Sequence, residues 1–127
     1  MFGNPKLERA AIESIYEDSA TISRRENVTG DDHITRAEWK TICENVICAL
    51  SYKGDSSRQT EAQHSLDYSR KLFVAPEVDI RPGDTIKVKR FGRFQPDSLL
   101  TEEYEVVGKP MHYLTHQEVP LKAVDLA

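Results

Sequence analysis

Residues 78–89 read VDIRPGDTIKVK and combine a turn signal with an alternating strand. Pro82 fixes φ at the first central position of a turn, and Gly83 can adopt the positive φ that the second position requires. The residues that follow alternate between apolar and charged, which is typical of a half-buried strand at 85–90. Its two faces would carry Ile86 and Val88 on one side and Lys87 and Lys89 on the other.

Short runs with the same alternation, bounded by Gly, Pro, Asn and Asp, fill most of the chain after residue 18. They predict strands at 20–24, 35–52, 64–73, 85–90, 104–107, 111–114 and 119–124. We expect 104–107 and 111–114 to form a hairpin, and 26–32 to form a polar loop. Residues 37–40 could instead be helical. Short strands at this spacing favour a small antiparallel β-barrel, because closure removes exposed sheet edges.

The first sixteen residues predict a helix. Asn4 is a good N-cap residue, Pro5 suits the first helical position, and Glu8 lies in the first turn. Leu7 and Ile15 fall on one apolar face. The expected organisation is therefore a helical arm at 1–16 and one barrel domain at 17–127.

Residues 53–63, KGDSSRQTEAQ, contain no large apolar side chain. A polar loop of this length is long for a compact barrel, and such loops are usually functional or disordered. The fold expected from the sequence is thus mainly β: a small antiparallel barrel with an N-terminal helix and one long polar loop.

The composition is that of an ordinary soluble protein, with 127 residues, 39% hydrophobic and 30% charged residues, and a net charge of −4. No apolar run approaches the roughly 18 residues of a membrane span, and the N-terminus is too polar for a signal peptide. Two cysteines do not make a disulfide scaffold. These features exclude a membrane protein, a cystine-rich secreted module and a strongly basic nucleic-acid binder.

No motif points to catalysis, a metal or a cofactor. Cys43 and Cys48 are five residues apart, which would place them on opposite faces of a regular strand, and the four histidines are scattered. There is no G-x-S-x-G nucleophile elbow. His116 and Glu118 could share a strand face as a general-base pair, but a polar turn is the preferred interpretation. We expect His116 and Gln117 to satisfy buried backbone groups at a barrel corner.

One short element is basic. Residues 81–93 carry five basic side chains against one acidic, a net charge of +4, which leaves −8 for the rest of the chain. Cations and aromatic rings alternate towards its end, where bases could stack. The candidate contacts to DNA or to a partner are Lys87, Lys89, Arg90 and Arg93, with Phe91 and Phe94 beside them. A single-stranded nucleic-acid-binding barrel is therefore an alternative function.

Three segments follow one another at short intervals in the second half of the chain. They are VDIRPGDTIKV (78–88), YEVVGKP (104–110) and YLTHQEVPL (113–121). Together they resemble the head–tail connector, or head-closure (stopper), family of tailed phages and defective prophages, over roughly residues 17–127. The resemblance implies a non-enzymatic subunit of a twelve-membered ring in the virion neck, assembled in the bacterial cytoplasm. The ring would close the DNA channel and dock the tail. Its implied partners are other copies of the chain, a portal–adaptor protein, a tail-completion protein and packaged DNA, with no membrane.

The family's long channel loop would correspond to residues 53–63. The candidate channel residues are Lys53, Gly54, Asp55, Ser56, Ser57 and Arg58. The small residues would allow the loop to rearrange, and the two cations could meet phosphate. Asp55 and Glu61 oppose direct contact with DNA.

Overall fold

The structure is a computed structural model that describes residues 4–52 and 70–124. One helix and seven strands are present in these ranges. They are α1 (Pro5–Glu13), β1 (Asp18–Thr29), β2 (Thr35–Tyr52), β3 (Arg70–Val74), β4 (Thr85–Lys89), β5 (Thr101–Val106), β6 (Met111–His112) and β7 (Gln117–Ala123). The chain is mainly β with one N-terminal helix, as predicted, and the predicted loop at 53–63 lies outside the described residues.

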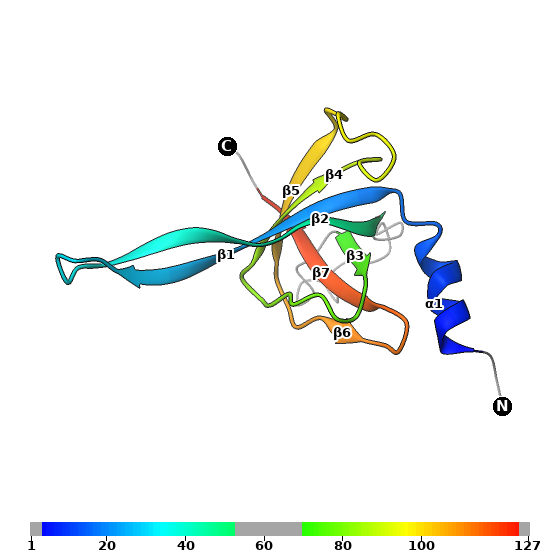
Figure 1. The fold of residues 1–127 in the computed structure, drawn as a ribbon, viewed down its shortest axis with the longest axis horizontal. Helices are drawn as coiled ribbons and strands as arrows, with labels where there is room; N and C mark the ends of the chain where they lie inside the picture. Colours follow the sequence, from blue (N-terminus) through cyan, green and yellow to red (C-terminus); the bar gives the residue numbers. More distant parts are fainter. Residues whose placement is uncertain (1–3, 53–69, 125–127) are drawn as a thin grey trace, which may run out of the picture.

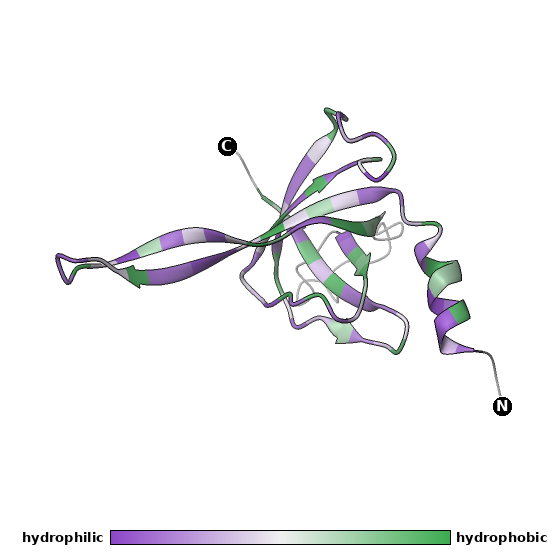
Figure 2. Ribbon diagram, viewed as in Figure 1, coloured by the Kyte–Doolittle hydropathy of each residue, from purple (hydrophilic) through white to green (hydrophobic). Residues whose placement is uncertain are grey.

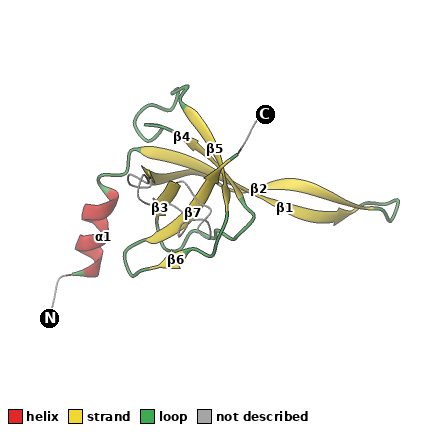
Figure 3. Ribbon diagram, turned by 180° about the vertical axis from the view of Figure 1, so that it is seen from behind, coloured by secondary structure: helices red, strands yellow, loops and turns green. Residues whose placement is uncertain are grey.

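The strands close into a small antiparallel barrel (Figures 1 and 3). Neighbours pair in the order β3-β2-β1-β4-β5-β7, and β7 also pairs with β3, which completes the ring. Every pairing is antiparallel. The short β6 pairs with the part of β7 that β5 leaves uncovered. The predicted barrel is therefore confirmed.

The barrel interior is filled by alternate side chains of its strands. Along β4, for example, Ile86 and Val88 are fully buried and Lys87 is exposed, as the alternation predicts. The buried cluster consists of Ala20, Ile22, Cys48, Leu72, Val74, Ile80, Ile86, Val88, Tyr104, Val106, Val119 and Leu121. Burial of these β-branched and aromatic side chains is the main stabilising contribution to the fold.

The turn before β4 is as predicted, and it is anchored to β1. Gly83 has a φ of 93°, and the Asp84 backbone N–H donates to the Arg81 carbonyl at 3.1 Å. The Asp84 carboxylate, 2% exposed, accepts two 2.9 Å hydrogen bonds from the Arg24 guanidinium and one from the Arg81 N–H. The bidentate contact between Arg24 and Asp84 fixes the turn to β1 at the point where β1 leaves the barrel.

The helix forms at the predicted place. The Asn4 side chain accepts from the Lys6 N–H at 3.0 Å and caps α1. Arg9 pairs with Glu77 of the barrel, but no residue of α1 is buried, and Leu7 and Ile15 remain exposed. The helix thus attaches to the barrel through polar contacts, and its apolar stripe is uncovered within the described residues.

The polar loop predicted at 26–32 is shorter than expected, because only its residues 30–32 lie in the turn between β1 and β2. Residues 26–29 continue β1, and residues 35–40 are strand rather than helix, so that β1 and β2 stay paired as far as Thr29 and Thr35. The paired ribbon projects beyond the barrel, at the opposite end of the molecule from α1 (Figures 1 and 3). A ladder of backbone hydrogen bonds forms a strand here without a buried face, so the apolar alternation used for prediction is missing.

The hairpin predicted between 104–107 and 111–114 is wrong. β5 pairs with β4 and β7, whereas β6 pairs only with β7. The end of β5 is already bonded elsewhere: Val106 exchanges backbone hydrogen bonds with Gly83 and Asp84, and the Val107 N–H donates to the Pro120 carbonyl. The chain after Val107 therefore continues alongside β7 and does not fold back on β5.

Candidate functional site

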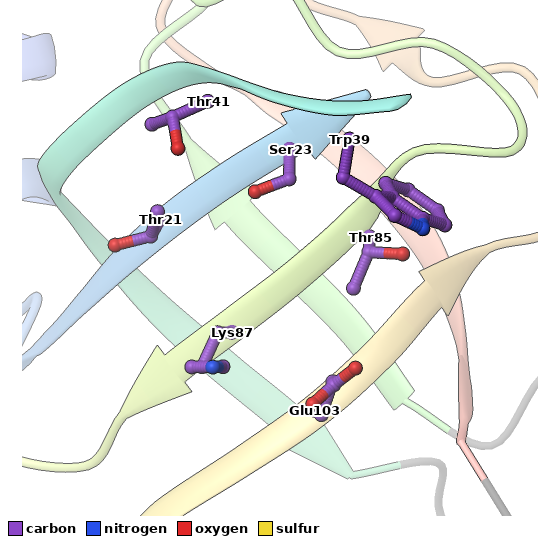
Figure 4. Close-up of a pocket in the computed structure, with 7 residues that line it drawn as sticks. All are labelled: Thr21, Ser23, Trp39, Thr41, Thr85, Lys87 and Glu103. Atoms are coloured by element: carbon purple, nitrogen blue, oxygen red, sulfur yellow. The ribbon is translucent and has the colours of Figure 1, made fainter. Parts of the chain in front are cut away.

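A groove of about 470 Å³ lies on the outer face of β1, β2, β4 and β5 (Figure 4). Its lining comes from the outward positions between the buried core residues, and Lys87 and Glu103 are cross-strand partners there. The lining residues are Thr21, Ser23, Trp39, Thr41, Thr85, Lys87 and Glu103. Hydroxyl groups therefore dominate the surface, with one cation, one anion and one indole ring.

Lys87 is the most available cation of the predicted basic element. It is exposed, and no hydrogen bond or ion pair to another residue of the described ranges occupies its ammonium group. Its neighbour across the ladder is Glu103, and β5 also carries Glu102 and Glu105. These carboxylates offset the positive charge of β4, so the groove has no strong basic potential.

The other three predicted cations are bonded within the chain. The Lys89 ammonium donates to the Pro96 carbonyl at 2.6 Å. The Arg93 guanidinium donates to the Glu13 carbonyl at 2.6 Å and to the Tyr16 carbonyl at 2.8 Å. The Lys89 bond closes the loop after β4 on itself, and the two Arg93 bonds tie this loop to the C-terminal end of α1 and the residues after it.

Arg90 is likewise paired, with acidic residues far away in the sequence. Its guanidinium lies 3.3 Å from the carboxylate of Asp18, which is buried, and 3.8 Å from the carboxylate of Glu102, which is partly exposed. Asp18 also accepts from the Phe91 N–H at 2.8 Å, which holds Phe91 at a φ of 64°. The basic cluster is therefore largely structural, and contact between it and DNA or a partner stays a prediction.

The projecting ribbon, which we call the arm and define as residues 25–40, is the largest exposed feature of the described chain. All residues from 31 to 40 are exposed, and three large apolar side chains among the arm residues are 41%, 53% and 57% exposed: Val28, Ile34 and Trp39. The arm is otherwise mostly hydrophilic in Figure 2. By the alternation of the ladder, Val28 and Ile34 lie on one face of the ribbon and Trp39 on the other, so each face presents apolar area among charged side chains.

A well-bonded turn closes the arm. Asp32 accepts from the Ile34 N–H at 3.0 Å and from Arg36 at 2.8 Å, and the His33 N–H donates to the Gly30 carbonyl at 3.0 Å. The Ile34 N–H and then the Arg36 guanidinium lower the pKa of Asp32. The ionised carboxylate therefore stabilises the turn.

The corner before β7 brings together the residues considered for general-base chemistry. His116 Nε2 lies 3.1 Å from Glu118 Oε2, and Lys71 Nζ lies 3.2 Å from the other carboxylate oxygen. Burial opposes ionisation of Glu118, but the hydrogen bonds from His116 and Lys71 outweigh it and lower the pKa of Glu118. The cluster links β3 to β7 through the Lys71–Glu118 ion pair, and the groove described above does not include it.

Gln117 has the predicted structural role. Its buried amide donates to the Ala75 carbonyl at 2.9 Å and to the Val78 carbonyl at 2.7 Å. His116 bonds through its ring to the Thr115 and Glu118 side chains, so the backbone role expected of it falls to Gln117 alone.

Among the described residues, no group of three or more His, Cys, Asp or Glu side chains could hold a metal ion. The expectation that Cys43 and Cys48 lie on opposite faces is wrong, because bulges in β2 and a positive φ at Asn45 change the alternation. Cys48 is buried, Cys43 packs against the core opposite Ile22, and both are free thiols. Burial raises the pKa of Cys48, which makes it unreactive.

The channel residues predicted from Lys53 to Arg58 lie outside the described residues. The strand predicted at 35–52 is confirmed as β2, but sequence reasoning missed the β1 half of the arm and the projection of the ribbon. A signal for it was present: β-branched pairs, Val28-Thr29 and Ile34-Thr35, flank a Gly-Asp-Asp-His turn.

Comparison with protein-family models finds no match, and comparison with curated proteins finds no relative. Among solved structures, the chain is similar to the solution structure of protein SF1141 from Shigella flexneri 2a. The two share 12% sequence identity, with a TM-score of 0.65 over 88% of this chain and 96% of that one. This similarity shows a shared fold. Within the described part of the chain, no helix is long and apolar enough to cross a membrane.

Proposed function

We propose that this chain is a structural head–tail connector, of the head-closure or stopper kind, from a tailed phage or defective prophage. In this role it assembles as a ring that closes the DNA channel and docks the tail. It performs no reaction. Its partners are further copies of itself, a portal–adaptor protein and a tail-completion protein, with packaged DNA in the channel.

The main support for this proposal is that the three sequence segments that resemble the connector family lie side by side in the fold. They supply most of β4, the second half of β5 and most of β7, and β5 pairs with both β4 and β7. The Pro82-Gly83 turn bonds to Val106, and Val107 bonds to Pro120. Segments that meet in space support a shared fold better than three separate short matches do.

The surface of the chain also favours a role in assembly. The arm presents exposed apolar side chains on a ribbon that no other described strand covers, and the N-terminal segment presents Leu7 in α1 and Ile15 just after it. Surfaces of this kind are typical of proteins that bury them against partners.

Deleting the gene from the phage or prophage that encodes it tests the proposal. We expect electron microscopy to show filled heads that lose DNA and separate, full-length tails. Complementation with the wild-type gene is the control. Stable heads already joined to tails, in particles without this protein, would contradict a connector role.

Single-stranded nucleic-acid binding is the competing function, supported by the exposed Lys87 and by Phe94, whose ring is 64% exposed and lies against the Arg93 guanidinium. It predicts that short oligonucleotides bind the purified chain with a steep salt dependence. Phe94→Ala and Lys87→Ala would then each weaken binding. The paired state of Lys89, Arg90 and Arg93 makes this the weaker proposal.

A further inference from the structure

The arm has two open backbone edges. β4 covers β1 only from Ser19 to Ser23, and β3 covers β2 only from Cys48 to Tyr52. Beyond these limits, β1 and β2 pair only with each other among the described strands. One side of the arm therefore presents the free edge of β1, and the opposite side presents the free edge of β2.

The hydrogen-bond pattern identifies the backbone groups on each edge. The Gly30 N–H donates to the Ile34 carbonyl, which makes Thr29 and Thr35 a non-hydrogen-bonded pair. Because the pattern alternates, the Asn27–Ala37 and Arg25–Trp39 pairs are also non-hydrogen-bonded. The N–H and C=O groups of these odd-numbered residues point away from the arm, outward from its two edges.

The arm is charged, but it lacks two other devices that protect a free edge. It contains no proline, and its strands are regular, since the bulges of the β1–β2 ladder lie nearer the barrel, between Ala20 and Ser23. A two-stranded ribbon is only marginally stable alone in water. A long open edge of this kind is a template for another strand.

Charge placement favours a second copy of this chain as that strand. Within the arm, Glu26 lies opposite Glu38, an unfavourable pair that Lys40 partly offsets at 3.9 Å from the Glu26 carboxylate. If β1 of one copy pairs with β2 of the next, with a shift of two residues from the register within the arm, Glu26 lies opposite Arg36, whose guanidinium would then be shared between Glu26 and the Asp32 of its own arm. The same register pairs Asn27 with Thr35, whose backbone groups both point outward.

We propose that arms of neighbouring copies pair edge to edge, β1 of one copy against β2 of the next. Copies oriented alike place these two strands antiparallel, so the contact repeats the pairing already present within each arm. The two edges differ, which makes the interface heterologous: it adds subunits in one direction and closes into a ring when the rotation permits. The ring itself rests on the proposed function, and the inference adds the contact that would join its subunits.

Two proline variants of the full chain test the pairing. Ala37→Pro removes an outward N–H from the β2 edge, and Asn27→Pro removes one from the β1 edge, while both leave the ladder within the arm intact. In sedimentation velocity over a concentration series, we expect the wild type to associate and each variant alone to be monomeric. An equimolar mixture should form a one-to-one dimer that grows no further, because each variant retains the edge that the other lacks.

Ala37→Val and Asn27→Thr are the matched controls, because both keep the N–H and favour strands. They should associate as the wild type does, and thermal melting should show the barrel intact in all four variants. A wild type that stays monomeric throughout, or an Asn27→Pro variant that associates by itself, would overturn the proposal. Neither result would bear on the connector role, which the gene deletion tests separately.

Discussion

The same two strands, β1 and β2, exist in two environments. At their base, β1 is covered by β4 and β2 by β3, and Ala20, Ile22 and Cys48 are buried in the core. In the arm, the strands pair only with each other among the described elements, and Ile34 is half exposed. One continuous ladder therefore joins a region stabilised by burial to a region stabilised by local hydrogen bonds.

The difference shows what each region depends on. A buried side chain contributes through the apolar area removed from water and through close packing. An arm side chain contributes little of either, so the backbone ladder and the Asp32 turn must hold the arm. Substitutions of one residue type should consequently have different costs in the two regions.

The largest contrast is between two isoleucines. Ile22→Ala should lower the free energy of unfolding by about 3–4 kcal/mol, because it empties a fully buried position in the barrel. Ile34→Ala in the arm should change it by less than about 0.5 kcal/mol. Urea denaturation of both variants measures the two values. Equal costs would mean that the arm is packed against something in solution.

The second effect concerns the joint between the regions. Asp84→Ala removes the carboxylate that accepts hydrogen bonds from Arg24 and the Arg81 N–H. We expect the free energy of unfolding to fall by about 2–3 kcal/mol, because the buried acceptor of Arg24 is lost. The contacts of its guanidinium with Asp79 would remain. Asp79→Ala, at an exposed position, is the matched control and should cost far less. Thermal melting of both variants measures the two losses of stability. Similar losses would contradict the larger role of the buried Asp84 carboxylate.

A smaller effect on the free energy of unfolding comes from the ion pair of Glu118 with Lys71, which links β7 to β3. Because this pair is partly exposed, we expect it to contribute less than about 1 kcal/mol. The pKa of Glu118 is lowered in the folded chain, so its contribution is present above the unfolded pKa and is lost as the pH falls through the folded one. Glu118→Gln should therefore destabilise the barrel at neutral pH, and the difference should shrink below about pH 4. Melting temperatures across that range measure it. A difference that stays constant with pH would contradict the ion pair.

Local signals predicted much of the barrel. Asn4 and Pro5 marked the start of α1, Pro82 and Gly83 marked the turn, and alternation marked β4, because each feature depends on neighbouring residues. The ionic partner of Arg90 could not be predicted, since Asp18 lies 72 residues away in the chain. Sequence reasoning could group the cations of this element, but it could not show that most of them are bonded internally.

Strand partners were the least predictable feature. The turn residues Gly108 and Pro110 suggested a hairpin, but the backbone of Val106 bonds to Gly83 and Asp84 instead, a contact across more than twenty residues. The continuation of β1 into the arm was missed for another reason. Its strands bury no face, so the apolar pattern that reveals strands elsewhere is absent.

The smallest effect should be confined to the arm. Asp32→Ala removes the acceptor for the Ile34 N–H and Arg36, so we expect faster amide hydrogen exchange at residues 28–36 and no change at Ile86 or Val88. Because the pKa of Asp32 is lowered, its contribution is lost as the pH falls through the folded value, and the wild-type arm should then exchange like the variant, after correction for the intrinsic rate. Asp31→Ala is the matched control. Faster exchange in the barrel of the Asp32 variant would show that arm and barrel unfold as one unit, and the distinction between the two regions would fail.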